Sequence, residues 1–166
     1  VYSFIFRIQA PGLSTTQYVL LIFAGLVPFI MTGEAISTGV SSVLANRAIL
    51  SNTVFPVDLI PAKSVLMSQV TMAVGMGILL FGLAYTQAMS IAIVFLPLIW
   101  LLHIMALLGV TWIISLVNLV FRDLQNLVSP LLMILMIISP IAYTPEMVPP
   151  GLKFLVLLNP FAYYII

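Results

Sequence analysis

Residues 64–121 read SVLMSQVTMAVGMGILLFGLAYTQAMSIAIVFLPLIWLLHIMALLGVTWIISLVNLVF and contain no Asp, Glu, Lys or Arg. The hydrocarbon layer of a bilayer is about 30 Å thick, and an α-helix needs roughly 20 apolar residues to cross it. This run is long enough for two crossings, and the polar break near its middle is YTQAMS at residues 85–90. We therefore predict a helical hairpin in a membrane, with arms at residues 64–83 and 91–117.

The composition of the whole chain is typical of a membrane protein. Hydrophobic residues make up 63% and charged residues 5% of the sequence, whereas a typical soluble domain has about 45–50% and 25%. The net charge of +1 gives no reason to expect nucleic acid as a partner. Because the sequence has no Cys, a thiolate nucleophile or Cys-based metal site is excluded, and no cofactor is expected. The predicted fold class is an all-α integral membrane protein with several transmembrane helices.

Both ends of the sequence are apolar. The chain begins with VYSFIF rather than with Met, and it stops at YYII. We expect an internal piece of a longer membrane protein. Residues 1–166 would then form a single, partial transmembrane domain, in which the first span is truncated and the last span is missing.

Two polar stretches, here called the first and second elbows, separate the apolar segments. A span predicted at residues 18–36 is followed by the first elbow, residues 37–62. The second elbow, residues 118–126, follows the hairpin, and the chain re-enters the membrane at residues 127–138. Cytoplasmic loops carry an excess of Lys and Arg, and this rule favours the cytoplasm for both elbows. The predicted cytoplasmic side has three basic residues, Arg47, Lys63 and Arg122. The other side has two, Arg7 and Lys153.

The segment after the last predicted re-entry lies on the outer side in this arrangement. Residues 139–159 contain four prolines, each of which lacks an N–H and interrupts a helix. Irregular backbone at membrane depth must be buried in protein or line a water-filled cavity. We predict that short re-entrant or interfacial helices within residues 139–164 line the exit of a transport path, with Tyr143 and Tyr163 as the candidates that face the substrate. The alternative is that these tyrosines anchor the chain at the headgroups.

Small residues along the first hairpin arm predict close packing against another helix. Ser64, Ser68, Thr71, Gly75 and Gly82 fall on a heptad-like stripe. Such residues let helix backbones approach closely in membranes. The stripe indicates packing and does not identify a function.

Two residues inside predicted spans, Glu34 and His103, carry a carboxyl and an imidazole group. A carboxylate at the bilayer centre costs at least about 2.5–3.5 kcal/mol, so Glu34 should face a partner or water. Two interpretations stay open: Glu34 borders a transport path, or it lies near the cytoplasmic end of its helix and bonds to Ser37 or Thr38. His103 has no acidic residue within two turns, and it is more typical of a hydrogen-bonded packing residue than of a catalytic base.

Other polar and aromatic residues are typical of the membrane surface. Arg122 and Asp123 end the second hairpin arm, where such a pair usually anchors a helix and reaches toward water. For Tyr85 and Trp100, an equally open interpretation is that they are ordinary belt aromatics at the membrane surface.

Three short segments follow one another in a specific order and spacing. They are SVLANRAIL at residues 42–50 with VFP at 54–56, FRDL at 121–124, and SPIAY at 139–143 with LNP at 158–160. With these segments, most of the chain resembles the membrane subunit of type-2 ABC exporters that carry O-antigen, capsular polysaccharide or teichoic acid.

The resemblance implies a permease subunit in the bacterial cytoplasmic (inner) membrane, surrounded by membrane lipid, that moves a lipid-linked polysaccharide. It would work as two copies with a separate ATP-binding cassette ATPase, and it would hydrolyse no ATP itself. A short helix at residues 44–55 would couple the ATPase to the spans; the alternative is a plain amphipathic surface helix. The coupling candidates are Asn46, Arg47, Ile49, Leu50, Asn52 and Phe55. The pathway candidates are Glu34, Tyr143 and Tyr163, and Arg122 with Asp123 marks the second elbow.

Two other classes stay open. A drug or small-lipid exporter of the same superfamily would have the same fold. An integral-membrane transferase that acts on lipid-linked substrates needs clustered acidic, His or Lys residues at one membrane face. The four acidic residues are instead scattered along the chain, at Glu34, Asp58, Asp123 and Glu146.

Overall fold

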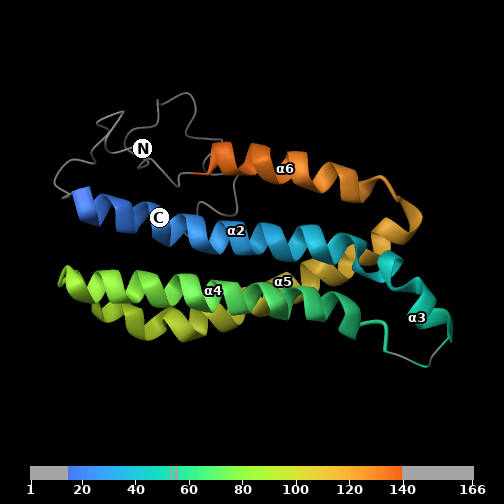
Figure 1. The fold of residues 1–166 in the computed structure, drawn as a ribbon, viewed down its shortest axis with the longest axis horizontal. Helices are drawn as coiled ribbons and strands as arrows, with labels where there is room; N and C mark the ends of the chain where they lie inside the picture. The colour runs from blue at the N-terminus through green and yellow to red at the C-terminus, as the bar shows by residue number, and fades with distance from the viewer. Residues whose placement is uncertain (1–14, 53, 55, 140–166) are drawn as a thin grey trace. The chain divides into compact units, whose positions relative to one another are not determined.

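The computed structural model describes residues 15–52, 54 and 56–139 of the chain. The helices, in chain order, are α2 (Thr15–Ala45), α3 (Arg47–Asn52), α4 (Leu59–Tyr85), the 3₁₀ helix η1 (Ile91–Phe95), α5 (Leu96–Val120) and α6 (Leu124–Ile138) (Figure 1). All regular structure in these residues is helical, which confirms the predicted all-α fold. The predictions for Phe55, Tyr143, Tyr163 and the outer segment beyond residue 139 fall outside the described residues.

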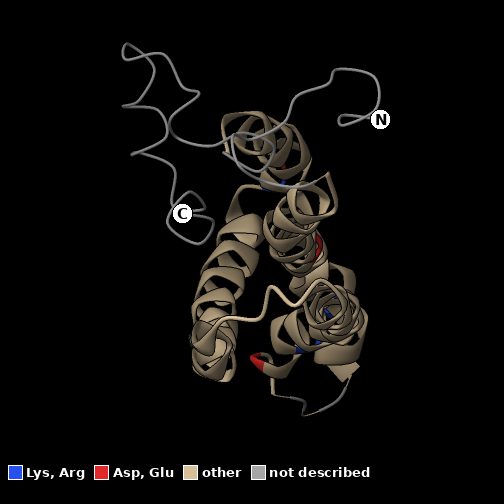
Figure 2. Ribbon diagram, turned by 90° about the vertical axis from the view of Figure 1, so that its left-hand side faces the viewer, with Lys and Arg blue, Asp and Glu red and all other residues tan. Residues whose placement is uncertain are grey.

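The described chain has three helical segments that are long and apolar enough to cross a membrane: Thr15–Asn52, Leu59–Tyr85 and Ile91–Val120. At a rise of 1.5 Å per residue, a helix of the length of α4 extends about 40 Å, more than the hydrocarbon layer of about 30 Å. Figure 2 shows how few Lys, Arg, Asp and Glu residues interrupt these helices. The predicted membrane class is therefore confirmed.

The turn between α4 and η1 falls at the predicted polar break. The hydroxyl of Thr86 donates to the carbonyl oxygen of Gly82 at 3.0 Å, which satisfies an acceptor at the end of α4. Gln87 has a φ of 52°, in the left-handed region that lets the chain reverse. Pro97 lies in the first turn of α5, where its missing N–H removes no helical hydrogen bond. The predicted hairpin is confirmed, although α4 begins earlier than expected, at Leu59.

α2 is longer than the predicted span, which ended at Ile36. The residues that follow are rich in Ser, Thr and Gly, and their composition is typical of a loop. Here the Thr38 hydroxyl donates to the carbonyl oxygen of Glu34 at 2.7 Å, and the Ser42 hydroxyl donates to that of Gly39 at 2.6 Å. Such bonds satisfy the side chain within its own helix, so this part of the first elbow remains helical.

The chain forms two compact units. Ile30–Ala73 and Ile91–Leu132 form one, here called the elbow unit, because it contains both elbows. The other includes α2 up to Phe29, the segment Val74–Ser90 and the end of α6 from Met133. The prediction of a single transmembrane domain stays a prediction.

Three helices pack together in the elbow unit. Ala35 of α2, Val65 of α4 and Leu107 of α5 form its buried apolar cluster. α2 and α5 approach each other closely at Gly39, where an added Cβ would lie 2.8 Å from Cγ2 of Thr111. The absence of a side chain at this glycine is therefore what allows the two helices to pack at this separation.

Two indole hydrogen bonds fix α5 against α4 in the elbow unit. Nε1 of Trp100 donates to Oε1 of Gln69 at 2.7 Å. Further along α5, Nε1 of Trp112 donates to the carbonyl oxygen of Asp58 at 2.9 Å, just before α4 begins. Because the later tryptophan bonds to the earlier partner, the two helices run antiparallel here, as a hairpin requires.

In the other unit, the predicted stripe of small residues brings α2 and α4 together. An added Cβ would lie 2.7 Å from Val27 at Gly75 and 2.6 Å from Leu20 at Gly82. These distances confirm close packing at both glycines. Thr71, by contrast, is exposed and does not take part in the stripe.

Candidate functional site

A polar groove lies in the elbow unit between the C-terminal half of α2, α3 and the first turns of α4. Its volume is about 550 Å³, within the range of about 300–1,000 Å³ that small-molecule sites occupy. Its polar lining consists of Glu34, Thr38, Ser41, Ser42, Asn46, Lys63 and Ser64. Its apolar lining consists of Ala45, Ile49, Leu59, Ile60 and Met67.

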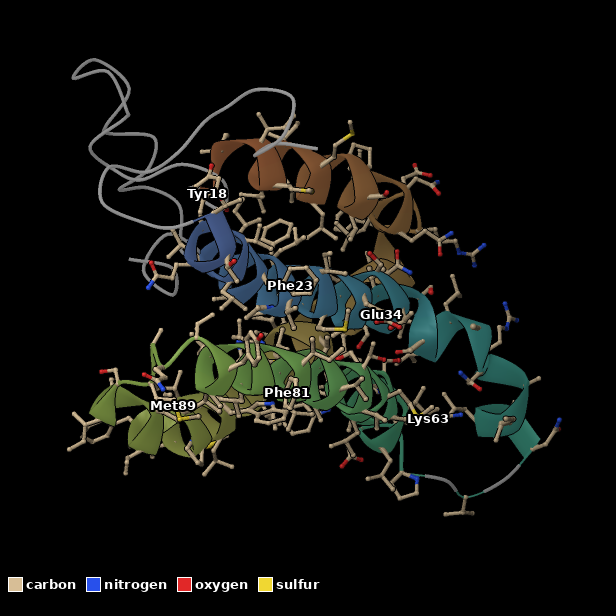
Figure 3. The ribbon with its side chains drawn as sticks, turned by 60° about the vertical axis from the view of Figure 1, so that its left-hand side comes forward. Tyr18, Phe23, Glu34, Lys63, Phe81 and Met89 are labelled. Atoms are coloured by element: carbon tan, nitrogen blue, oxygen red, sulfur yellow. The ribbon has the colours of Figure 1, made fainter. Side chains whose placement is uncertain are left out.

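The groove contains one carboxylate and one ammonium group. Glu34 projects from α2 and Lys63 from the start of α4 (Figure 3), and both side chains are exposed. In the described part of the chain, neither charged group has an ion-pair partner. Thr38 bonds to the backbone carbonyl of Glu34 rather than to its carboxylate. The carboxylate is therefore available to a ligand in the groove.

The hydroxyls of the groove fall into two groups. Those of Thr38 and Ser42 donate to backbone carbonyls of α2. Those of Ser41 and Ser64 have no hydrogen-bond partner among the described residues, so both can donate to and accept from a bound molecule. Charged groups and free hydroxyls thus line the same groove.

Asn46 separates α2 from α3 and forms the turn between them. Its Nδ2 donates to the carbonyl oxygen of Ser42 at 2.8 Å. Its own carbonyl oxygen accepts from the N–H of Ile49 at 3.0 Å and from that of Leu50 at 3.2 Å. One residue therefore ends the helix that forms one wall of the groove and starts the next helix.

α3 is shorter than the coupling helix predicted at residues 44–55. It covers Arg47–Asn52 and has no buried residue, while Leu44 belongs to α2. The coupling candidates Arg47, Leu50 and Asn52 lie on α3, whereas Phe55 falls outside the described residues. The helix begins later than predicted because α2 continues to Ala45.

Trp112 attaches the first elbow to α5. Its indole bond to the Asp58 carbonyl borders a cavity of about 260 Å³. Val43, Val57, Pro61, Ser115 and Leu116 complete the lining of this cavity. The sequence analysis assigned no role to Trp112, because the bond joins residues that are far apart in the chain.

The buried face of α5 is largely polar. Its buried residues recur every three or four positions, at His103, Leu107, Thr111, Ser115 and Asn118. Nε2 of His103 lies 3.2 Å from Oγ1 of Thr32, so His103 is a packing residue, as predicted. The indole N–H of Trp100 bonds to Gln69 on the neighbouring helix, and its interpretation as a belt aromatic stays a prediction.

The second elbow is a short turn between α5 and α6. Asn118 is fully buried, and its Oδ1 accepts from the N–H of Gln125 at 3.2 Å, in the first turn of α6. Arg122 and Asp123 are exposed, as expected of a surface turn, and they do not line the polar groove.

The structure brings Glu34 and Asn46 together with residues that the sequence analysis did not select. Lys63, Ser41 and Ser64 line the same groove. The signal that pointed to such partners was the free-energy cost of placing Glu34 in a span. That cost could not identify Lys63 as a neighbour of Glu34, because Lys63 lies on a different helix, α4.

The fold and the groove define a polytopic, all-α membrane protein with a polar site beside a helical elbow. The chain is similar to the O-antigen export system permease protein RfbA of Klebsiella pneumoniae, with 30% identity over 168 residues and 98% of the chain covered. A second protein of that name from the same organism is 29% identical over the same length. The protein of that name from Myxococcus xanthus is 28% identical over 128 residues, or 76% of the chain.

These relatives are longer than the chain. The chain spans 63% of the length of each Klebsiella relative and 49% of the Myxococcus relative. No family model matches it. The resemblance to the membrane subunit of O-antigen exporters, predicted from the three short segments, is confirmed by these similarities.

Proposed function

We propose that the full-length protein is the permease subunit of an ATP-driven exporter that moves lipid-linked polysaccharide across the bacterial cytoplasmic membrane. The observation that carries the proposal is the similarity to O-antigen export permeases along 98% of the chain. Helices long enough to span a membrane support it. O-antigen is the favoured substrate; capsular polysaccharide and teichoic acid polymers are further substrates of the resembling family.

In this proposal, two copies of the protein form the transport path and a separate ATPase supplies the work. α3 is the coupling element that docks on the ATPase, and its lack of buried residues supports an open docking surface. Because Asn46 joins α3 directly to a wall of the groove, a displacement of α3 would reach the groove. Such a transition is a two-state movement of helices rather than a chemical step.

Glu34 borders the transport path in this proposal. Its position in an open polar groove rather than in a salt bridge supports that role. Tyr143 and Tyr163 remain predicted to line the exit on the outer side.

The experiment that tests the function is deletion of the permease in its bacterial host, followed by complementation with the full-length protein. We expect deletion to abolish surface polysaccharide and to leave lipid-linked polymer inside the cell, and complementation to reverse both effects. Complementation should fail when the ATPase partner is catalytically inactive. Unchanged surface polysaccharide with lost resistance to small drugs would instead favour a drug exporter.

The purified full-length protein is expected to hydrolyse no ATP unless the ATPase partner is added. Phosphate release from protein reconstituted in vesicles, with and without the partner, measures this directly. ATPase activity of the permease alone that is abolished by substitutions in the permease would contradict the division of labour.

A further inference from the structure

The polar groove has an arrangement that a plain packing interface does not require. It contains one negative and one positive side chain that do not pair with a described residue, and two hydroxyls that are likewise free. All four groups lie on helices that are apolar enough to span a membrane. Charged side chains in such segments almost always face a water-filled cavity or a polar partner, because their transfer into hydrocarbon is costly.

A suitable ligand must satisfy both charges and the hydroxyls. A phosphate group suits Lys63, which binds phosphate as a point charge, and the adjacent Ser64 can donate a further hydrogen bond. An ionised Glu34 only accepts hydrogen bonds, so it suits a ligand that carries O–H or N–H donors. Ser41 can donate or accept, as a sugar hydroxyl can.

Resting on the proposed function, we propose that this groove binds the glycosyl phosphate head of the lipid-linked substrate. Lys63 and Ser64 hold the phosphate, and Glu34 and Ser41 bind hydroxyls of the first sugar. The apolar rim has exposed Leu59 and Met67, which suits the first part of the lipid chain. This assignment gives Lys63 a role in substrate recognition.

Other phosphate-bearing headgroups of the membrane offer part of the same chemistry. A phosphodiester with an ammonium group would also satisfy Lys63, Ser64 and Glu34, but it would leave Ser41 without a hydroxyl partner. A plain anionic phosphate would place negative charge near Glu34 without a donor for it. The free hydroxyl of Ser41 beside Glu34 therefore favours the sugar phosphate.

Four probes distinguish these sources on the full-length protein reconstituted in lipid nanodiscs. They are glucose 1-phosphate esterified with decanol, decyl glucoside without phosphate, decyl phosphate without sugar, and decyl phosphoethanolamine. We expect the glucose phosphate ester to bind at least about tenfold more tightly than each of the others, since hydrogen bonds to charged groups contribute the most. Equal or tighter binding of decyl phosphoethanolamine would overturn the proposal in favour of a phospholipid headgroup.

Variants assign the two ends of the ligand. Lys63→Gln should weaken binding of the glucose phosphate ester about tenfold or more and leave decyl glucoside unaffected, whereas Lys63→Arg should retain binding. Glu34→Gln should weaken binding of the sugar-bearing probes and leave decyl phosphate unaffected. Thr71→Ala, which removes an exposed hydroxyl of α4 outside the groove, is the matched control and should change nothing.

Exchanging the two charged residues tests the alternative that Glu34 and Lys63 form an ion pair with each other and bind no ligand. The double variant Glu34→Lys with Lys63→Glu should remain defective in binding, because the phosphate would then meet a carboxylate. Restored binding in this variant would overturn the proposal and indicate a structural ion pair. Normal export by both Lys63→Gln and Glu34→Gln would also overturn the proposed binding site. If the wild-type protein itself exported no lipid-linked polysaccharide, the proposed function would be refuted.

Discussion

His103 shows how this chain keeps a polar side chain inside an apolar span. The residue is 8% exposed, and its Nε2 lies 3.2 Å from Oγ1 of Thr32 on α2. A hydrogen bond between helices in a membrane contributes about 0.6 kcal/mol on average and up to about 1.7 kcal/mol. The pair therefore adds specificity to the contact between α2 and α5 more than it adds stability.

A double-mutant cycle with Thr32→Val and His103→Leu measures this bond. We expect a coupling free energy of about 0.6–1.7 kcal/mol, obtained from detergent-induced unfolding of the full-length protein in mixed micelles. Single-variant effects that add to within about 0.3 kcal/mol would show that the two side chains do not interact.

Asn118 of α5 caps the start of α6. Its Oδ1 accepts a backbone N–H of the first turn, and removal of such a cap typically costs about 1 kcal/mol. Asn118→Ala should therefore lower the free energy of unfolding by no more than about that amount, because it also removes the buried Nδ2, which has no hydrogen-bond partner among the described residues. Ser129→Ala, at an exposed position of α6, should have little effect in the same unfolding assay.

The limits of sequence reasoning at this scale are visible at Thr38 and Ser42. Hydroxyl residues near a predicted span end favour a loop by composition, and the prediction placed the first elbow there. In an apolar environment the same hydroxyls bond to carbonyls of their own helix, so the helix continues. Composition identifies the polar groups but does not identify where they find their partners.

Among the helices, the contact between α2 and α5 depends on Gly39. Gly39→Ala would place a Cβ 2.8 Å from Cγ2 of Thr111, and overpacking of this kind typically costs about 1–3 kcal/mol. We expect a loss of that size in unfolding by detergent. Gly109→Ala is the matched control on α5, because an added Cβ there meets no atom within 4 Å.

A compensating change tests the cause of this loss. Thr111→Ser removes the obstructing Cγ2 and keeps the hydroxyl that donates to the Leu107 carbonyl at 2.7 Å. Gly39→Ala should therefore be less destabilising when Thr111→Ser is present. Equal losses with and without the second substitution would show that the steric explanation is wrong.

The sequence predicted the long helices better than the short one. The hairpin followed from a charge-free run and one polar break, which reflect the thickness of the bilayer rather than any particular contact. α3 lies in a segment where charge, proline and hydroxyl residues are mixed, so no periodic pattern fixes its ends. Its beginning depends on the backbone carbonyl of Asn46, which accepts from the N–H groups of Ile49 and Leu50.

At the scale of the whole molecule, the proposed assembly predicts where the ATPase touches the permease. In a background that contains no other accessible cysteine, Arg47→Cys on α3 should cross-link to the ATPase partner in membranes. Tyr85→Cys is the control, because Tyr85 is 83% exposed at the far end of α4, about 40 Å from its start. Cross-links from Tyr85→Cys to the ATPase, or only to lipid from Arg47→Cys, would contradict the docking of α3.

Only some of the residues that line the polar groove could be predicted from the sequence. Glu34 was selected because its charge is out of place in a span, and the resemblance supplied the class of protein. Lys63 and Ser64 were not selected, because their proximity to Glu34 results from the packing of α2 against α4 in the elbow unit. Which residues share a cavity depends on the tertiary structure.

The two tryptophans of this sequence are natural fluorophores at two different positions along the contact between α4 and α5. Trp100 bonds to Gln69 within α4, and Trp112 bonds to the backbone just before α4. In each single Trp→Phe variant, the emission wavelength of the remaining indole would report one contact. Any tryptophan of a partner protein contributes equally to both variants, so its emission cancels in the difference between their spectra. Nucleotide-driven rearrangement that is confined to the first elbow would shift the emission of Trp112 alone. Sliding of the whole helix pair would shift both emissions, so the order and extent of the movement can be timed without an attached dye.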